Sequence, residues 1–125
     1  MIIQIDTESD IPIYTQLTNQ IIEGIARGDI QPGHSLPSVR AFAADLGVNM
    51  HTVNKSYHEL EKKGVIKIVP KSGAMISPID NINNETKQRI ISELKPHLAE
   101  ALVLGMGKEE IKSLINTIIG EMKER

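Results

Sequence analysis

The stretch Leu46–Gly64, "LGVNMHTVNKSYHELEKKG", predicts a helix with one apolar face and one basic face. If the helix starts near Asn49, then Val53, Tyr57 and Leu60 fall on one side at helical spacing. At 100° per residue, a stripe of histidines and lysines follows the opposite side: His51, Lys55, His58 and Lys62. One face is therefore expected to pack on a core, while the other faces solvent or a partner.

Charge is unevenly distributed along the chain. The formal net charge of −2 over 125 residues argues by itself against a nucleic-acid partner. Residues 50–71, however, carry five lysines against two glutamates, a local charge of +3. Residues 1–49 carry two arginines against six acids. The basic segment is the one that contains the two-faced helix.

Composition limits the possible classes of protein. With 40% hydrophobic and 24% charged residues, the chain is an ordinary globular one, and its 125 residues fit one domain or a small domain with an appendage. There is no cysteine, which excludes disulfides and thiolate metal sites. No apolar run reaches the ~18 residues of a membrane span, and the N-terminus lacks signal-peptide features. We expect a cytoplasmic protein with no membrane partner.

The sequence offers no catalytic or cofactor constellation. It has no glycine-rich phosphate loop, no serine elbow and no paired acids in a constrained turn, so neither an enzyme nor a cofactor is expected. His51 and His58 lie about 10 Å apart by helix rise, which is too far for one ion, while His34 and His97 belong to other elements. No metal site is predicted.

The order of elements around the two-faced helix predicts the fold. Residues 1–5 are an apolar run expected to form a strand, and residues 12–27 a helix with Leu17 and Ile21 inward, ended by Gly28. After a loop, Ser38 caps a short helix that Gly47 ends, and Asn49 caps the next. Two apolar segments joined by "PKSG" then form a hairpin. This is the order of a winged helix-turn-helix.

The C-terminal third has a different character. A polar, asparagine-rich linker precedes two helical patterns that "GMG" (residues 105–107) separates. The sequence thus predicts an α+β protein: a winged helix-turn-helix DNA-binding domain over residues 1–80 and a two-helix, all-α dimerisation or regulatory tail over residues 81–125. Helices so rich in Ile and Leu must pack on the winged domain or on a partner copy, and two-fold dimers are the commonest solution.

Four segments in order carry a family resemblance: "PIYTQL" (residues 12–17), "PGHSLPSVRAFAADLGVN" (32–49), "TVNKSYHELEKKGVI" (52–66) and "SGAMI" (72–76). They resemble the DNA-binding domain of the GntR family of bacterial transcription regulators. The short tail resembles the YtrA-type branch, whose helical tail dimerises. The resemblance implies a homodimer on a two-fold symmetric operator of double-stranded DNA, with the recognition helix in the major groove and the wing in the minor groove.

The chemistry of the stripe and the resemblance together give the expected DNA-binding residues. Polar side chains on the first turns of the helix suit base edges, and cations suit phosphates. By resemblance, Arg40 contacts phosphate, and Ser72 and Gly73 form the wing tip with Lys71 beside them. The full set is Ser38, Arg40, Asn49, Met50, His51, Thr52, Asn54, Lys55, His58, Lys71, Ser72 and Gly73.

Two of these positions have alternative interpretations. Many family members carry arginine where this chain has Met50, which is able to make only apolar or thymine-methyl contacts; Met50 could instead cover part of the core. Arg40 could instead pair with an acid such as Asp45.

The expected dimer interface lies on the two C-terminal helices. It comprises Ile90, Ile91, Leu94, Leu98, Leu102, Ile111, Leu114, Ile115, Ile118 and Ile119. We therefore predict a sequence-specific transcription regulator, expected to be a repressor. Two alternatives remain: a winged-helix module that binds an acidic protein without DNA specificity, and a regulator gated by an effector in a groove at the dimer interface. The sequence does not identify an effector.

Overall fold

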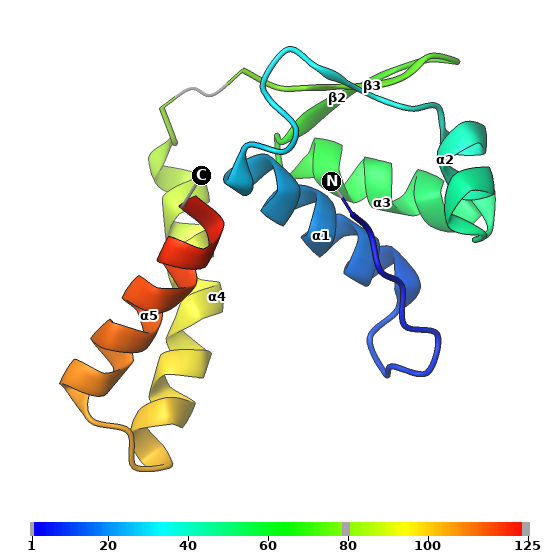
Figure 1. Ribbon diagram of the computed structural model, residues 1–125. Helices are drawn as coiled ribbons and strands as arrows, with labels where there is room; N and C mark the ends of the chain where they lie inside the picture. The colour runs from blue at the N-terminus through cyan, green and yellow to red at the C-terminus, as the bar shows by residue number, and fades with distance from the viewer. Residues whose placement is uncertain (1, 79–80, 124–125) are drawn as a thin grey trace. The chain divides into compact units, whose positions relative to one another are not determined.

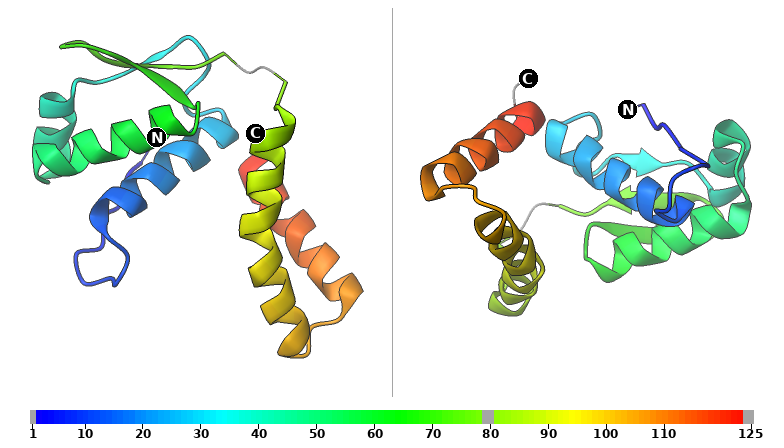
Figure 2. Two further views of the ribbon diagram at one scale, coloured as in Figure 1. Left: turned by 180° about the vertical axis from the view of Figure 1, so that it is seen from behind. Right: turned by 90° about the horizontal axis from the view of Figure 1, so that it is seen from below.

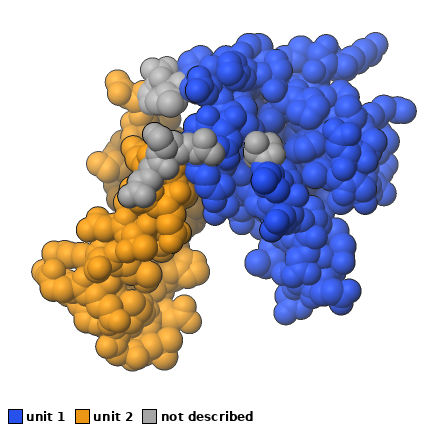
Figure 3. Space-filling view, viewed as in Figure 1, with its two compact units in different colours: residues 1–79, 125 blue, residues 80–124 orange. Residues whose placement is uncertain are grey.

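The structure, a computed structural model, describes residues 2–78 and 81–123. Residues 2–78 fall in one compact unit and residues 81–123 in another (Figure 3). The first unit contains α1 (Ile13–Arg27), β1 (Ser35–Leu36), α2 (Val39–Leu46), α3 (Met50–Lys62), β2 (Ile66–Val69) and β3 (Gly73–Ile76). The second contains α4 (Asn84–Val103) and α5 (Lys108–Lys123) (Figure 1). The winged helix-turn-helix architecture with two further helices is confirmed.

The core of the first unit forms where α1, α3 and the sheet meet. In Figures 1 and 2 the strands lie along one side of α3. Most of the fully buried apolar side chains come from the stripes of α1 and α3, and one comes from the sheet: Leu17, Ile21, Val53, Tyr57, Leu60 and, from β3, Ile76. Two polar side chains are buried with them, and they satisfy each other, because the Thr18 and Ser56 hydroxyls lie 2.8 Å apart. This pair links α1 to α3 without leaving an unpaired polar group.

The helix ends follow the predicted signals. The Ser38 hydroxyl accepts from the backbone N–H of Ala41 at 3.2 Å, and the Asn49 side chain accepts from that of His51 at 2.7 Å. Gly28 and Gly47 end α1 and α2 in the left-handed conformation. The caps at Gly47 and Asn49 fix the tight turn between α2 and α3, and so the direction of α3 relative to α2.

The sheet has three antiparallel strands in the order β1-β3-β2. The hairpin of β2 and β3 was predicted, whereas β1 lies in a segment interpreted as a loop. β1 has only two residues, Ser35 opposite Met75 and Leu36 opposite Ala74. So short a strand has no alternating pattern of its own, and β3 supplies its pairing.

The prediction of a strand near the N-terminus is wrong for the described residues. Residues 2–6 form no strand, although Ile3 and Ile5 pack against the core. Side chains of α1 take the place of a partner strand. The Gln20 amide accepts from the Gln4 N–H and donates to the Gln4 carbonyl at 2.8 and 2.7 Å. Gln16 does the same for Asp6, at 2.9 Å each way.

The second unit is a helical hairpin. Asn83 caps α4 by accepting from the Thr86 N–H at 2.7 Å, and Gly105, with φ of 103°, lies in the turn before α5. No residue of α4 is buried, and the exposed side chains include Ile91, Leu94 and Leu102. Much of the apolar surface of α4 is therefore exposed in the single chain.

Candidate nucleic-acid interface

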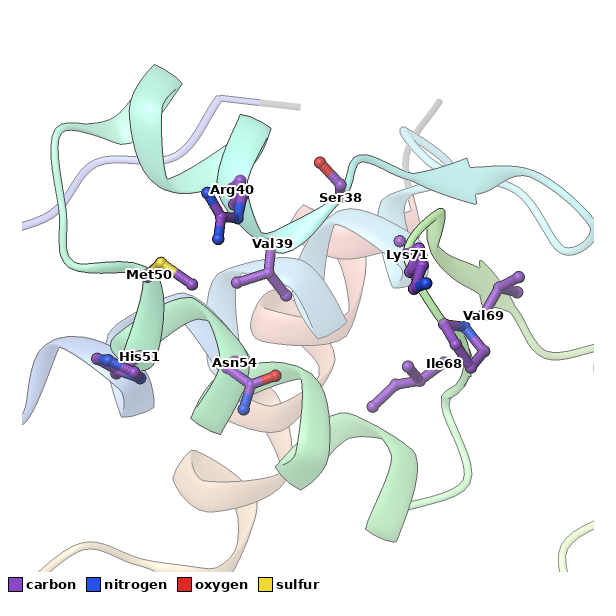
Figure 4. Close-up of a pocket in the computed structure, with 11 residues that line it drawn as sticks. Ser38, Val39, Arg40, Met50, His51, Asn54, Ile68, Val69 and Lys71 are labelled. Atoms are coloured by element: carbon purple, nitrogen blue, oxygen red, sulfur yellow. The ribbon is translucent and has the colours of Figure 1, made fainter.

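A groove of about 580 Å³ lies between the start of α2, the first turns of α3 and the hairpin (Figure 4). It brings together seven of the twelve predicted residues: Ser38, Arg40, Met50, His51, Asn54, Lys71 and Gly73. Four apolar residues complete its lining: Val39, Ile68, Val69 and Pro70. Three segments distant in sequence thus contribute to one concave surface, with polar and cationic groups on the elements that border it.

The N-terminal end of α3 carries the side chains suited to base edges. His51 and Asn54 are exposed and line the groove. Asn49 is exposed too, but its side-chain oxygen is occupied as the cap of α3, which leaves its amide N–H₂ as the group to offer a partner. Thr52 is half-buried and does not line the groove. His51 and Asn54 are therefore the polar groups of α3 best placed to hydrogen-bond in the groove.

Arg40 borders the groove from the first turn of α2. It is exposed and makes no ion pair with Asp45 or with any other acid among residues 2–78 and 81–123. The alternative that Asp45 holds its guanidinium is not supported. An exposed, unpaired guanidinium is available for a bidentate contact with an anion such as phosphate.

Lys55 points to a different neighbour. Its ammonium lies 4.1 Å from the centroid of the Tyr14 ring on α1, a cation–π geometry, and Lys55 does not line the groove. Tyr14, which is not among the predicted site residues, thus orients a basic side chain. Its position near the start of α1 carries no local signal for this contact, which depends on how α1 and α3 cross.

The wing combines an exposed tip with a buried base. Lys71 and Ser72 are exposed, and Lys71 has a positive φ of 66° in the turn. Gly73 is buried instead, at the start of β3. The Glu61 carboxylate of α3 accepts from the Ile68 N–H at 2.8 Å and so ties β2 to the helix. This bond, together with the core packing of Leu60 and Ile66, holds the wing beside α3.

Tyr57 connects α3 to the start of α2. Its hydroxyl donates to the Pro37 carbonyl at 2.6 Å, directly before the cap residue Ser38. Burial of the phenol raises the pKa of Tyr57 above its ordinary value, so the group remains a neutral donor. His58, on the exposed face of the same helix, lies outside the groove.

The described part of the chain contains no cluster of three His, Asp or Glu side chains arranged to hold a metal ion. Among the same residues, no helix is both long enough and apolar enough to cross a bilayer.

A second surface feature belongs to α4 alone. An apolar groove of about 490 Å³ runs along the helix and is lined by Ile91, Leu94, Lys95, Leu98, Ala99 and Leu102. Four of the predicted interface residues lie here. On α5, four more are exposed: Leu114, Ile115, Ile118 and Ile119. Ile111 differs, since it is only 8% exposed in the single chain and has little surface left for a partner.

The sequence and the fold of the chain are similar to those of known regulatory proteins. The profile of "Bacterial regulatory proteins, gntR family" matches residues 13–76. The HTH-type transcriptional repressor YtrA of Bacillus subtilis is 37% identical, over 97% of this chain and 95% of its own. A transcriptional antiterminator from Listeria monocytogenes EGD-e superposes with a TM-score of 0.88 at 31% identity, covering 98% of this chain and 92% of its own.

Two further solved structures extend the comparison. YtrA from Sulfolobus acidocaldarius, described as a GntR-family transcription factor, has a TM-score of 0.60 at 39% identity and covers 95% of this chain and 97% of its own. The DNA-binding domain of AraR, solved in complex with operator ORE1, has a TM-score of 0.52 at 25% identity and covers 62% of this chain and 94% of its own.

Proposed function

Because the chain belongs to the GntR family of bacterial transcription regulators, we propose that it represses transcription as a homodimer bound to a two-fold symmetric DNA operator. DNA binding and transcription regulation are properties of the family. Repression, the dimer and the symmetric operator are specific to this proposal. Repression is supported by the similarity to the YtrA repressor over nearly the whole length of both chains.

The observation that carries the proposal is the groove beside α3. A recognition helix enters the major groove with its N-terminal residues against base edges. His51 and Asn54 occupy those turns and are exposed, and Arg40 and Lys71 add cations from the neighbouring elements. Hydrogen-bonding groups on the helix, with cations around them, match the division between base contacts and phosphate contacts in protein–DNA complexes.

The second unit supports the dimer. Its apolar stripe along α4 is exposed in the single chain, with Leu94 50% exposed and Leu102 57% exposed. Covering this stripe with a second copy would bury apolar area without requiring any other component. Two copies related by a two-fold axis would present two α3 helices, and such a pair selects an inverted repeat.

The test is a selection of random duplex DNA by the purified full-length protein at near-physiological salt, followed by sequencing. We expect enrichment of an inverted repeat whose half-sites lie about one helical turn apart. The same selection with His51→Ala should alter base preference at one position per half-site. An unenriched pool, or enrichment of a single unrepeated site, would contradict the proposed symmetric operator.

Repression requires a separate measurement. A promoter that contains the selected repeat should lose activity in a purified transcription assay when the protein is added, and a promoter with a scrambled repeat should not. An increase in transcript at the intact repeat would show that the protein is an activator.

A further inference from the structure

Met50 is an unusual residue for the position that it occupies. It is the first residue of α3, it lines the groove, and it is 38% exposed. It belongs neither to the buried core nor to the partly buried residues that pack against that core. More than a third of the Met50 surface is therefore open to a ligand, while the rest is covered by the domain, as the alternative interpretation expected.

The chemistry of the side chain narrows what it is able to contact. Methionine has no hydrogen-bond donor and only a weak sulfur acceptor, so it is a poor partner for phosphate or for the polar edges of bases. In the major groove, the apolar group on the edges of the four bases is the 5-methyl of thymine. A flexible, polarisable side chain at the tip of a recognition helix is well suited to that methyl group.

The surroundings of Met50 favour the same contact. Val39, from the first turn of α2, lines the same groove. His51 and Asn54, the next groove residues of α3, supply hydrogen-bonding groups for the neighbouring base edges. The start of α3 thus offers an apolar contact beside polar ones, and this is the arrangement needed to distinguish thymine from cytosine at one position while neighbouring positions are read by hydrogen bonds.

We propose that Met50 specifies a thymine in each operator half-site by packing on its 5-methyl group. The inference rests on the proposed function, because it presupposes that α3 enters the major groove of an operator. It adds which base one residue selects and by which chemical group.

The test uses the selected operator with single chemical changes. Each thymine in turn is replaced by deoxyuridine, symmetrically in both half-sites, which removes one methyl group and leaves base pairing intact. At one position we expect the dissociation constant to rise about fourfold per half-site, the equivalent of one buried methyl group. At that position cytosine should also weaken binding, and 5-methylcytosine should bind more tightly than cytosine, since it restores the methyl.

Two variants assign the effect to Met50. Met50→Ala should bind the thymine and deoxyuridine duplexes equally at that position, because the side chain that detects the methyl is gone. Met50→Leu, of similar size and polarity, should retain a preference for thymine. Thermal unfolding of both variants checks that the fold is intact, and the exposed position of Met50 predicts a small change.

The outcomes separate this inference from the function on which it rests. If the selection yields an operator but no deoxyuridine substitution weakens binding, only the role of Met50 is overturned. The same holds if Met50→Ala keeps the full sensitivity to the methyl group. If the selection yields no preferred sequence, the proposed function fails, and the inference fails with it.

Discussion

At the scale of single residues, Gly73 was predicted to contact DNA, and the structure gives a separate reason, within the fold, for glycine at this position. Its φ of 102° is left-handed, and a Cβ built there would overlap the Leu36 carbonyl oxygen and approach the Pro37 carbonyl carbon to 2.7 Å. The chain passes so close to the β1 backbone that no side chain fits. Glycine at this position is therefore required by the sheet, whether or not the wing touches DNA.

We predict that Gly73→Ala lowers the free energy of unfolding by roughly 3 kcal/mol, because it combines backbone strain with a backbone overlap. Gly28→Ala is the matched control. Gly28 also has a positive φ, of 85°, but open space around the missing Cβ, so about 1 kcal/mol is expected. Urea unfolding followed by circular dichroism measures both. Equal losses would mean that the overlap with β1 costs nothing.

A second prediction at this scale concerns how the stability contributed by Tyr57 depends on pH. Its pKa is raised in the folded protein by burial, above an unfolded value of about 10. The unfolded chain therefore releases the phenolic proton first, and the stability that Tyr57 contributes is complete below pH 10 and falls as pH rises above it. The fall should be about 1.4 kcal/mol per pH unit.

The measurement is the stability of the wild type minus that of Tyr57→Phe, by urea unfolding between pH 8 and pH 11.5. Near pH 8 the wild type should be more stable by about 1 kcal/mol, the value of the hydrogen bond to Pro37. The difference should shrink above pH 10, while the lysine titrations common to both proteins cancel. A difference that stays constant to pH 11.5 would refute the raised pKa.

At the scale of elements, the N-terminal segment depends on two glutamines of α1. Gln16 and Gln20 lie one turn apart and bond the backbone of Asp6 and Gln4, respectively, in the way that a neighbouring strand would. Replacing Gln20 with alanine should release the Gln4 amide to fast hydrogen exchange while Asp6 stays protected, and Gln16→Ala should do the reverse. Asn19→Ala, at an exposed position of the same helix, is the control and should change neither.

The elements also show how far sequence predicts this structure. Helices with caps were predictable because the signals are local: Ser38, Asn49 and Gly47 act within a few residues of where they stand. β1 was not, because its two residues become a strand only by pairing with β3, about 40 positions later. The N-terminal strand was predicted from apolar residues alone, yet its hydrogen bonds go to side chains of α1.

The candidate site, too, was predictable from the sequence only in part. Exposure of the stripe on α3 followed from helical periodicity, and His51, Lys55, His58 and Lys62 are all exposed. Which of them share a groove with Arg40 and the wing did not follow, because that depends on tertiary packing. Lys55 lies over Tyr14, and nothing near either residue in the sequence indicates this.

At the scale of the whole molecule, the second unit carries the prediction of a dimer. Leu94→Glu places a charge in the centre of the apolar groove on α4, at a side chain exposed in the single chain, so the fold itself should survive. We expect a monomer by sedimentation and operator affinity reduced roughly 100-fold, since linked half-sites lose their avidity. Ser92→Glu adds the same charge to an exposed position of α4 outside the groove and should remain dimeric.

Symmetry gives the last prediction, because in a dimer each phosphate contact occurs twice. The logarithm of the DNA association constant falls linearly with the logarithm of the salt concentration. The slope is about −0.9 for each phosphate contact. Arg40 is exposed, borders the groove and has no ion-pair partner among the described residues, so its removal should cost only the DNA contact. Arg40→Ala should therefore make the slope shallower by about 1.8 for a dimer, against about 0.9 for a monomer.

Filter binding or fluorescence anisotropy between 50 and 300 mM salt measures the slope, with Arg27→Ala as the control. Arg27 is an exposed cation at the end of α1 and lies outside the groove, so its loss should leave the slope unchanged. A shift of about 0.9 for Arg40→Ala would mean that only one subunit contacts phosphate through this residue. An unchanged slope would remove Arg40 from the interface, because a guanidinium that displaces counterions must appear in the salt dependence wherever on the duplex it binds.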